Sequence, residues 1–170
     1  AIHLGHRKSI DFDLFKNGKI DSVAIKKKLA KNGIKYKVLF ENKDGLHLLI
    51  DGVKWTFFTY PFSIYSAALA TKHFKLPDLL TLAAMKAYAL GRRSKWKDYV
   101  NLFSILQKSH TLSEIVKRAN DLFEDGFSEK MFRVQLSYFK DIDYSETIDW
   151  MVPPVSDNKI KKELIKFSIS

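Results

Sequence analysis

The sequence predicts an α+β fold, in which a small mixed β-sheet with flanking helices is followed by a helical half. Short segments that alternate apolar and polar residues with a period of two fill roughly the first 60 residues, and apolar residues at helical spacing follow Pro61. The chain has 170 residues, of which 46% are hydrophobic and 14% aromatic. This composition is sufficient for a real hydrophobic core. The sequence contains no cysteine, which excludes a disulfide framework and any thiolate metal site.

The first part of the chain is expected to form the sheet. The predicted strands are residues 10–15, 34–40, 46–50 and 53–60. A helix that Asp21 or Ser22 caps and that ends at Gly33 lies between the first two strands. The turn sequences at residues 42–45 and 51–52 connect the later strands.

The second part of the chain is expected to be helical. The predicted helices are residues 78–90, 94–106, 111–123 and 128–138, and a short amphipathic helix at residues 160–167. Ser94 is the expected cap of the second helix, and Thr111 and Glu114 have the spacing of a capping box. Residues 141–155 are predicted to be an irregular connector. We therefore divide the chain into an α/β core, residues 1–62, and a helical half, residues 63–170.

The distribution of charge favours a polyanionic partner. The formal net charge is +10, and the basic excess lies in the first 110 residues, whereas residues 111–155 are acidic overall. Such a field attracts a phosphate backbone or a nucleoside triphosphate. The alternative is a solvated lysine surface, which Lys26-Lys27-Lys28 alone would favour. No apolar run approaches the length of about 20 residues that spans a bilayer, and residues 1–9 lack a signal pattern. We therefore expect a cytoplasmic protein with no membrane partner.

Asp11 and Asp13 are candidate metal ligands. Residues two apart on a strand share one face, so both carboxylates can reach the same magnesium ion. Magnesium is usually bound by one or two carboxylates together with substrate phosphates. The alternative is a half-exposed strand whose acids only face solvent, although aspartate is depleted in strands.

Lys86 is the only charged residue in the otherwise apolar segment 79–90, which is predicted to be a buried helix. A buried ammonium group needs a partner. Lys86 therefore contacts a triphosphate or the aspartates, or it reaches the surface along its aliphatic stem. Asp98 is expected in the first turn of the next helix, where an acid also complements the helix dipole.

Two features of the N-terminal segment also concern a candidate site. His3 and His6 resemble a zinc pair, but without cysteine or a further histidine nearby we expect no metal there. Arg7 precedes the Asp11 strand closely and could bridge a phosphate or fix the carboxylates. The sequence contains no glycine-rich phosphate loop of Walker or Rossmann spacing.

Three blocks of sequence carry a family resemblance. The blocks are Leu4–Phe15 (LGHRKSIDFDLF), Leu82–Ala89 (LAAMKAYA) and Arg93–Tyr99 (RSKWKDY). In this order and spacing they resemble the AbiEii/AbiGii-type toxin family of nucleotidyltransferases, over the chain from its start to about Gln107. The resemblance implies a polymerase-β-like nucleotidyltransferase core with a helical half that completes the active site.

The resemblance also implies roles for individual residues. The implied catalytic residues are Asp11, Asp13, Lys86 and Asp98, of which Asp11 and Asp13 hold magnesium or manganese. The candidate nucleotide-binding residues are Arg7, Ser9, Lys86, Arg93 and Lys97. Arg93 and Lys97 are included because phosphoryl transfer depends on neutralising the charge of the triphosphate.

We therefore expect a magnesium-dependent nucleotidyltransferase that transfers a nucleoside monophosphate from a nucleoside triphosphate to an acceptor, with RNA, such as transfer RNA, as the favoured acceptor. The resemblance implies the toxin of a toxin-antitoxin or phage-defence (abortive infection) pair, with a cognate antitoxin as partner. The sequence departs from the family in three places. The glycine-rich element expected upstream of His6 is absent, as if the N-terminal motif were truncated. Thr56 stands where a third carboxylate is expected, and Asn101 where relatives often have an aspartate. These departures leave open a catalytically impaired nucleotide- or RNA-binding member of the same fold, or a two-metal nuclease.

Overall fold

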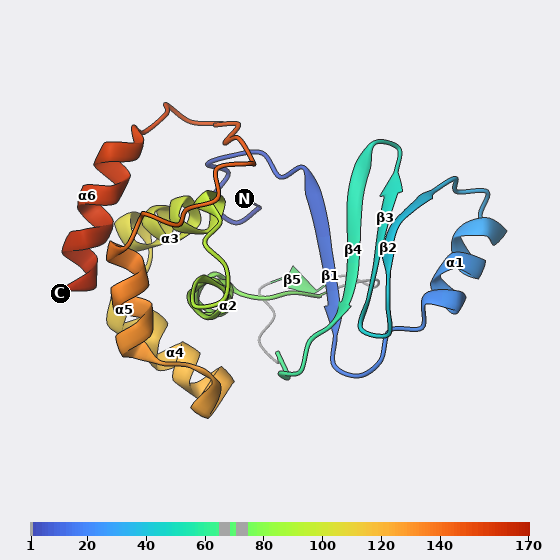
Figure 1. Ribbon diagram of the computed structural model, residues 1–170, viewed down its shortest axis with the longest axis horizontal. Coiled ribbons are helices and arrows are strands. Elements are labelled where there is room, and N and C mark those ends of the chain that lie inside the picture. Colours follow the sequence, from blue (N-terminus) through green and yellow to red (C-terminus); the bar gives the residue numbers. More distant parts are fainter. Residues whose placement is uncertain (1, 65–68, 71–74) are drawn as a thin grey trace. The chain divides into compact units, whose positions relative to one another are not determined.

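The computed structural model describes residues 2–64, 69–70 and 75–170 (Figure 1). In this part of the chain it contains a four-stranded mixed sheet and six α-helices, which confirms the predicted α+β class. The chain divides into two compact units. Residues 9–63 form the sheet unit, and residues 1–8 together with residues 64–170 form the helical unit. Each unit is described by itself.

The sheet unit contains four strands in the spatial order β1-β4-β3-β2. The strands are β1 (Asp11–Lys16), β2 (Lys37–Glu41), β3 (Gly45–Ile50) and β4 (Val53–Thr59). Strand β1 pairs in parallel with β4, whereas β4 with β3 and β3 with β2 are antiparallel pairs. The helix α1 (Ser22–Lys31) connects β1 to β2. Because β4 lies between β1 and β3, the first strand of the sequence becomes one edge of the sheet.

Helix α1 covers one face of this sheet. Its N-terminus is capped by Asp21, whose side chain accepts a hydrogen bond of 2.8 Å from the Ala24 amide. The chain leaves the helix through Gly33 at a φ of 68°, a conformation that favours glycine. The apolar side of α1 packs on the sheet through Ile25 and Leu29. The small core beneath it consists of Leu46, Leu48 and Ile50, with Tyr36, Trp55 and Phe57 at its border.

The strand register assigns the residues of β1 to opposite faces. Phe12 lies beside Trp55, which belongs to the core under α1. Asp11 and Asp13 lie beside Lys54 and Thr56. Because successive residues of a strand point to opposite faces, both aspartates lie on the face of the sheet that α1 does not cover.

The helical unit contains five α-helices and a short pair of strands in its described part. The helices are α2 (Leu79–Leu90), α3 (Trp96–Lys108), α4 (Leu112–Phe123), α5 (Glu129–Ser137) and α6 (Asp157–Ser168). The strands β5 (Leu69–Ala70) and β6 (Lys75–Leu76) form an antiparallel pair. The completely buried core side chains include Ala83, Tyr99, Leu102, Ile115, Leu136, Ile160 and Leu164. Of the described helices, none is long and apolar enough to cross a membrane.

The predicted N-terminal capping residues of α2 and α4 are present, whereas that of α3 is not. Asp78 caps α2 by accepting a hydrogen bond of 2.7 Å from the Thr81 amide, and the predicted capping box of Thr111 and Glu114 is present at α4. The prediction that Ser94 caps α3 is wrong. The Ser94 hydroxyl donates instead to a carboxylate oxygen of Asp141 at 2.9 Å, and α3 begins two residues later without a side-chain cap.

The N-terminal segment pairs with the connector that precedes α6. The Lys8 amide donates to the Asp149 carbonyl at 2.8 Å, and the Met151 amide donates to the His6 carbonyl at 3.0 Å. Arg7 and Trp150 form an isolated antiparallel bridge between these two bonds. The backbone of the irregular connector is therefore held in place by residues from the start of the chain.

Candidate functional site

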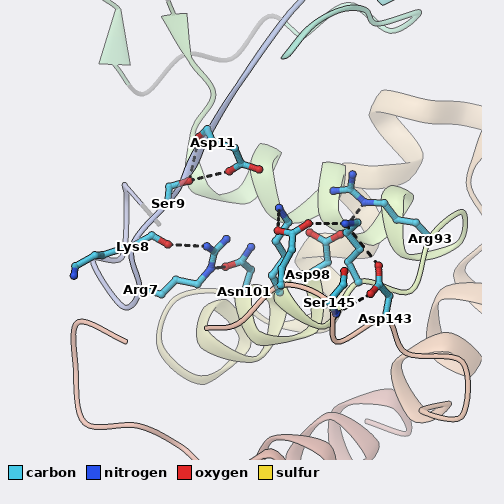
Figure 2. Close-up of polar contacts among 12 residues, drawn as sticks. Arg7, Lys8, Ser9, Asp11, Arg93, Asp98, Asn101, Asp143 and Ser145 are labelled. Carbon is cyan, nitrogen blue, oxygen red and sulfur yellow. Dashed lines mark hydrogen bonds and ion pairs between the residues drawn. The ribbon is translucent and has the colours of Figure 1, made fainter. Parts of the chain in front are cut away.

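The carboxylates of Asp11 and Asp13 lie on the same face of β1, as the alternation of the sequence predicts. Figure 2 shows Ser9 beside Asp11, where the Ser9 hydroxyl donates to a carboxylate oxygen and to the backbone carbonyl of Asp11, both at 3.3 Å. The Asp13 side chain is exposed. Ser9, which we expect to help bind a nucleotide, is therefore in contact with one of the two candidate metal ligands.

A row of four side chains crosses this face of the sheet. Asp13 lies beside Thr56, Thr56 beside His47, and His47 beside Phe40. The pKa of His47 is lowered by burial and by the charge of Lys54, against the opposing effect of Asp13. An imidazole whose pKa is lowered is mostly neutral at pH 7. His47 was not predicted to lie at this site, although a lone polar residue between Leu46 and Leu48 was a signal.

Asp11 and Asp13, on the face of the sheet opposite α1, suit a metal ion that is held partly by the protein and partly by a substrate. In residues 2–64, 69–70 and 75–170, no group of three or more histidine, aspartate or glutamate side chains is arranged to hold a metal ion. Two carboxylates on one face provide the oxygen ligands that magnesium prefers, with the remaining positions left to water and substrate phosphates. Asp11 and Asp13 therefore fit a magnesium ion that is shared with a substrate, and they do not form an all-protein cage.

Asp98 is the centre of a buried ion cluster in the helical unit. Its side chain is completely buried in the first turn of α3. Lys86 of α2 places its Nζ 2.6 Å from Oδ1, and Arg93 places its Nε 2.9 Å from Oδ2 (Figure 2). Burial raises the pKa of Asp98, but the two cations outweigh this effect and lower the pKa below its usual value. Lys86, the lone charge of an apolar helix, thus has a carboxylate partner.

Lys97, the third cation expected at a triphosphate, also has an acidic partner. Its Nζ lies 2.5 Å from one carboxylate oxygen of Glu146, and Lys95 approaches the other oxygen at 2.5 Å. Burial raises the pKa of Glu146, but the hydrogen bonds from both lysines lower it further than burial raises it. The connector that contains Glu146 is tied to the start of α3 by these contacts.

Arg7 and His6 share one acceptor, the Oδ1 atom of Asn101. Arg7 Nε donates to this atom at 3.0 Å (Figure 2), and His6 Nε2 lies 3.0 Å from the same atom. The guanidinium group can only donate, so the amide oxygen must face Arg7 and His6 Nε2 must donate to the same oxygen. Burial is the main reason that the pKa of His6 is lowered to about 4. His3 has a different partner, since its Nε2 lies 2.8 Å from the carbonyl oxygen of Pro77.

The predicted site residues fall into the two units. Ser9, Asp11 and Asp13 belong to the sheet unit, and Arg7, Lys86, Arg93, Lys97 and Asp98 belong to the helical unit. The first three lie together on or next to β1. In the helical unit the structure brings Lys86, Arg93 and Asp98 into direct contact, whereas Lys97 pairs with Glu146 and Arg7 with Asn101.

Comparisons with known proteins find similarity in sequence to a curated protein of unknown function. No family model matches the chain, and the comparison with solved structures finds no significant match. The chain is similar to the uncharacterized protein aq_aa25 of Aquifex aeolicus (strain VF5), with 32% identity over 113 residues. The matched region is 63% of this chain and 53% of that protein. The chain thus spans about half the length of this curated relative.

Proposed function

We propose that this chain is a magnesium-dependent nucleotidyltransferase with a polymerase-β-like core, similar to the AbiEii/AbiGii-type family. The observation that carries the proposal is the position of Asp11 and Asp13 on the face of the sheet that α1 leaves uncovered. Aspartate is depleted in strands, so two aspartates on one face of β1 favour a role in binding a ligand. The three blocks of sequence resemblance support the same assignment.

In the proposed reaction, an acceptor hydroxyl oxygen forms a bond to the α-phosphorus of a nucleoside triphosphate. The bond from the α-phosphorus to the oxygen that bridges it to the β-phosphorus breaks, pyrophosphate leaves, and the hydroxyl proton passes to solvent. Asp11 and Asp13 would hold magnesium, which supplies positive charge to the phosphates. The protein's main contributions to such a reaction are positioning and electrostatic stabilisation.

Lys86 and Arg93 are the cations that we assign to the triphosphate. Their side chains keep 26% and 44% of their surface exposed while each binds one oxygen of the buried Asp98. Each head group has further N–H donors beyond the bond to Asp98. In this proposal Asp98 is a positioning residue, because it holds both cations in fixed places without contacting substrate.

RNA is the proposed acceptor because of the charge of the chain. The net charge is +10, and α1 exposes Lys27, Lys28 and Lys31. Surface lysines of this kind bind a phosphate backbone without sequence preference. The role of a toxin with an antitoxin partner and the cytoplasmic location stay predictions that follow from the resemblance and the composition.

The test is an incorporation assay. The protein is incubated with magnesium, each radiolabelled nucleoside triphosphate in turn and total cellular RNA, and the RNA is separated on a denaturing gel. We expect label on a discrete RNA, a loss of at least about 100-fold in Asp11→Asn and Asp13→Asn, and no label in the presence of a chelator. Asp44→Asn is the matched control, since Asp44 is an exposed acid in a turn of the same unit. If both site variants label RNA at the wild-type rate, the assignment is wrong.

A binding protein of the same fold that has lost catalysis is the second candidate. The specific observation in its favour is the register of β1 and β4, which places Thr56, where a third carboxylate would be expected, beside Asp13. This candidate predicts RNA binding with a steep salt dependence but no incorporation of label. Degradation of the RNA without incorporation would instead favour a two-metal nuclease.

A further inference from the structure

His47 lies on the same face of the sheet as the candidate metal ligand Asp13. Its neighbours in β3, Leu46 and Leu48, belong to the core under α1, so its imidazole points to the opposite face. The strand register places His47 beside Thr56, and Thr56 beside Asp13. A single residue therefore separates His47 from Asp13 across the sheet, over two strand spacings of about 4.8 Å each.

The ring nitrogens of His47 are available to a bound molecule. Within the described part of the chain, neither nitrogen forms a hydrogen bond to another residue. The side chain is partly exposed. The ring of Phe40 packs against the imidazole, with ring centroids 5.2 Å apart, and is itself 49% exposed. Phe40 thus supports one side of the ring, and the two nitrogens are left to water or to a substrate hydroxyl group.

The surroundings of His47 favour its neutral form. Burial lowers the pKa of the imidazole, Lys54 of β4 lowers it further, and Asp13 of β1 raises it. Strand β3 has no other charged residue. Strand β2 contributes the uncharged Phe40 beside His47 and, two positions farther along the register with β3, Lys37. The neutral imidazole has a nitrogen lone pair that can accept a proton at pH 7, whereas the protonated ring has none.

We propose that His47 is a catalytic residue that accepts the proton of the acceptor hydroxyl group, which lies over Thr56 between Asp13 and His47. This inference rests on the proposed function. As the hydroxyl oxygen bonds to the α-phosphorus and pyrophosphate leaves, the O–H bond breaks and the proton binds the lone pair of a ring nitrogen. The imidazolium then releases the proton to solvent, so the reaction balances as before. Thr56 has no carboxylate that could take this proton, and His47 is the next residue across the sheet.

The first test compares His47→Gln with the native protein in the incorporation assay, with the RNA and the nucleoside triphosphate that the native protein uses. Loss of a general base should lower kcat by about 100-fold, while the KM for the triphosphate changes by less than about threefold. The native kcat should decline toward acid pH as His47 becomes protonated, and this decline should be absent from His47→Gln. His110→Gln is the matched control, because His110 is a partly buried histidine of the helical unit. Its kcat and pH profile should be native.

The second test changes the pKa of His47 and leaves the histidine in place. In the protein without added metal, the imidazole NMR signals of His47 measure this pKa. It should rise in Lys54→Gln, because the substitution removes a nearby positive charge from an exposed position. The acid decline of kcat should then move to higher pH, which a purely structural role of His47 does not predict. Lys43→Gln changes an exposed lysine in the turn between β2 and β3 and should move neither.

Two results would overturn the inference. The first is a His47→Gln protein with the native kcat and pH profile. The second is a Lys54→Gln protein in which the pKa of His47 rises but the acid decline of kcat stays in place. Either result, together with an inactive Asp11→Asn protein, would leave the nucleotidyltransferase proposal standing. A native protein that labels no RNA would instead refute the proposed function and the role of His47 with it, so the two failures are distinguishable.

Discussion

Lys86 and Asp98 form an ion pair of 2.6 Å between Nζ and Oδ1, and the Asp98 carboxylate has no exposed surface. Arg93 occupies the second oxygen. Removing a carboxylate from water costs several kcal/mol, and only well-placed partners on both oxygens repay that cost. The pair also joins α2 to α3, and both helices contribute buried side chains to the core of the helical unit. Removal of one partner would therefore leave the charge of the others uncompensated within this unit.

Replacement of Asp98 by asparagine should destabilise the helical unit. The amide keeps the size of the side chain but leaves Lys86 and Arg93 facing a neutral group, which we expect to cost about 3 kcal/mol of the free energy of unfolding. Urea unfolding followed by tryptophan fluorescence measures this in a Trp55→Phe background, where Trp96 and Trp150 of the helical unit give the signal.

Asp121→Asn is the control for this substitution. Asp121 is an exposed acid of α4, and its replacement should change the free energy of unfolding by less than about 0.5 kcal/mol. Equal unfolding curves for the Asp98 and Asp121 variants would show that the buried ion pair contributes no net stability.

The same cluster predicts how stability depends on acid pH. The pKa of Asp98 in the folded state lies below its ordinary value of 3.8, because Lys86 and Arg93 together outweigh the effect of burial. The stabilisation is therefore fully present above pH 3.8 and is lost as the pH falls through the lower folded-state pKa. The unfolding free energy of the Trp55→Phe protein should decline more steeply below that pH than that of its Asp98→Asn derivative. Parallel pH profiles would contradict this assignment.

The elements of the fold were predictable where local patterns decide them. The alternation around Asp11 and Asp13 predicts their shared face because a strand has a period of two residues. The parallel pairing of β1 with β4 was not readable, because any strand of the sheet could have been its neighbour. The start of α3 was predicted wrongly because Ser94 has a competing partner, Asp141, that lies far away in the sequence.

The candidate site was predictable to a similar extent. The need of Lys86 for a partner followed from a charge in an apolar helix, and the structure provides Asp98. The pairing of Lys97 with Glu146 was not predictable, because the connector has no periodic pattern that places its residues. The position of His47 beside Thr56 depends on strand register, which becomes visible only when the sheet is assembled.

An acidic residue in place of Asn101 should raise the pKa of His6. In the native protein the pKa of His6 is lowered to about 4, chiefly by burial. A carboxylate at the same acceptor position favours the protonated imidazole, so Asn101→Asp should raise the pKa of His6 by at least about one unit. The pKa is measured by following the imidazole NMR signals between pH 3.5 and 8. Asn120→Asp, which adds the same charge on exposed α4, should leave it unchanged.

The Asn101→Asp substitution should also alter how the free energy of unfolding depends on pH. The unfolded state binds a proton near pH 6.5, whereas His6 in the folded state does so only near pH 4. Stability contributed by the neutral ring is therefore complete above pH 6.5 and declines as the pH falls toward 4. We expect this decline to be smaller in Asn101→Asp than in the native protein. An identical decline in both would mean that His6 does not titrate in this range.

The packing of α1 on the sheet can be tested with two leucines. Leu48 of β3 is completely buried beneath α1, whereas Leu39 of β2 is 46% exposed. Truncation of a buried leucine leaves a cavity and costs about 3 kcal/mol, so Leu48→Ala should lower the amide protection of β3, β4 and α1 together by about 100-fold in hydrogen exchange. Leu39→Ala should lower it by less than about tenfold. Equal effects of the two substitutions would mean that α1 does not cover the face of the sheet that contains Leu48. The two faces would then be equally uncovered, and the position of Asp11 and Asp13 on the opposite face would lose its significance.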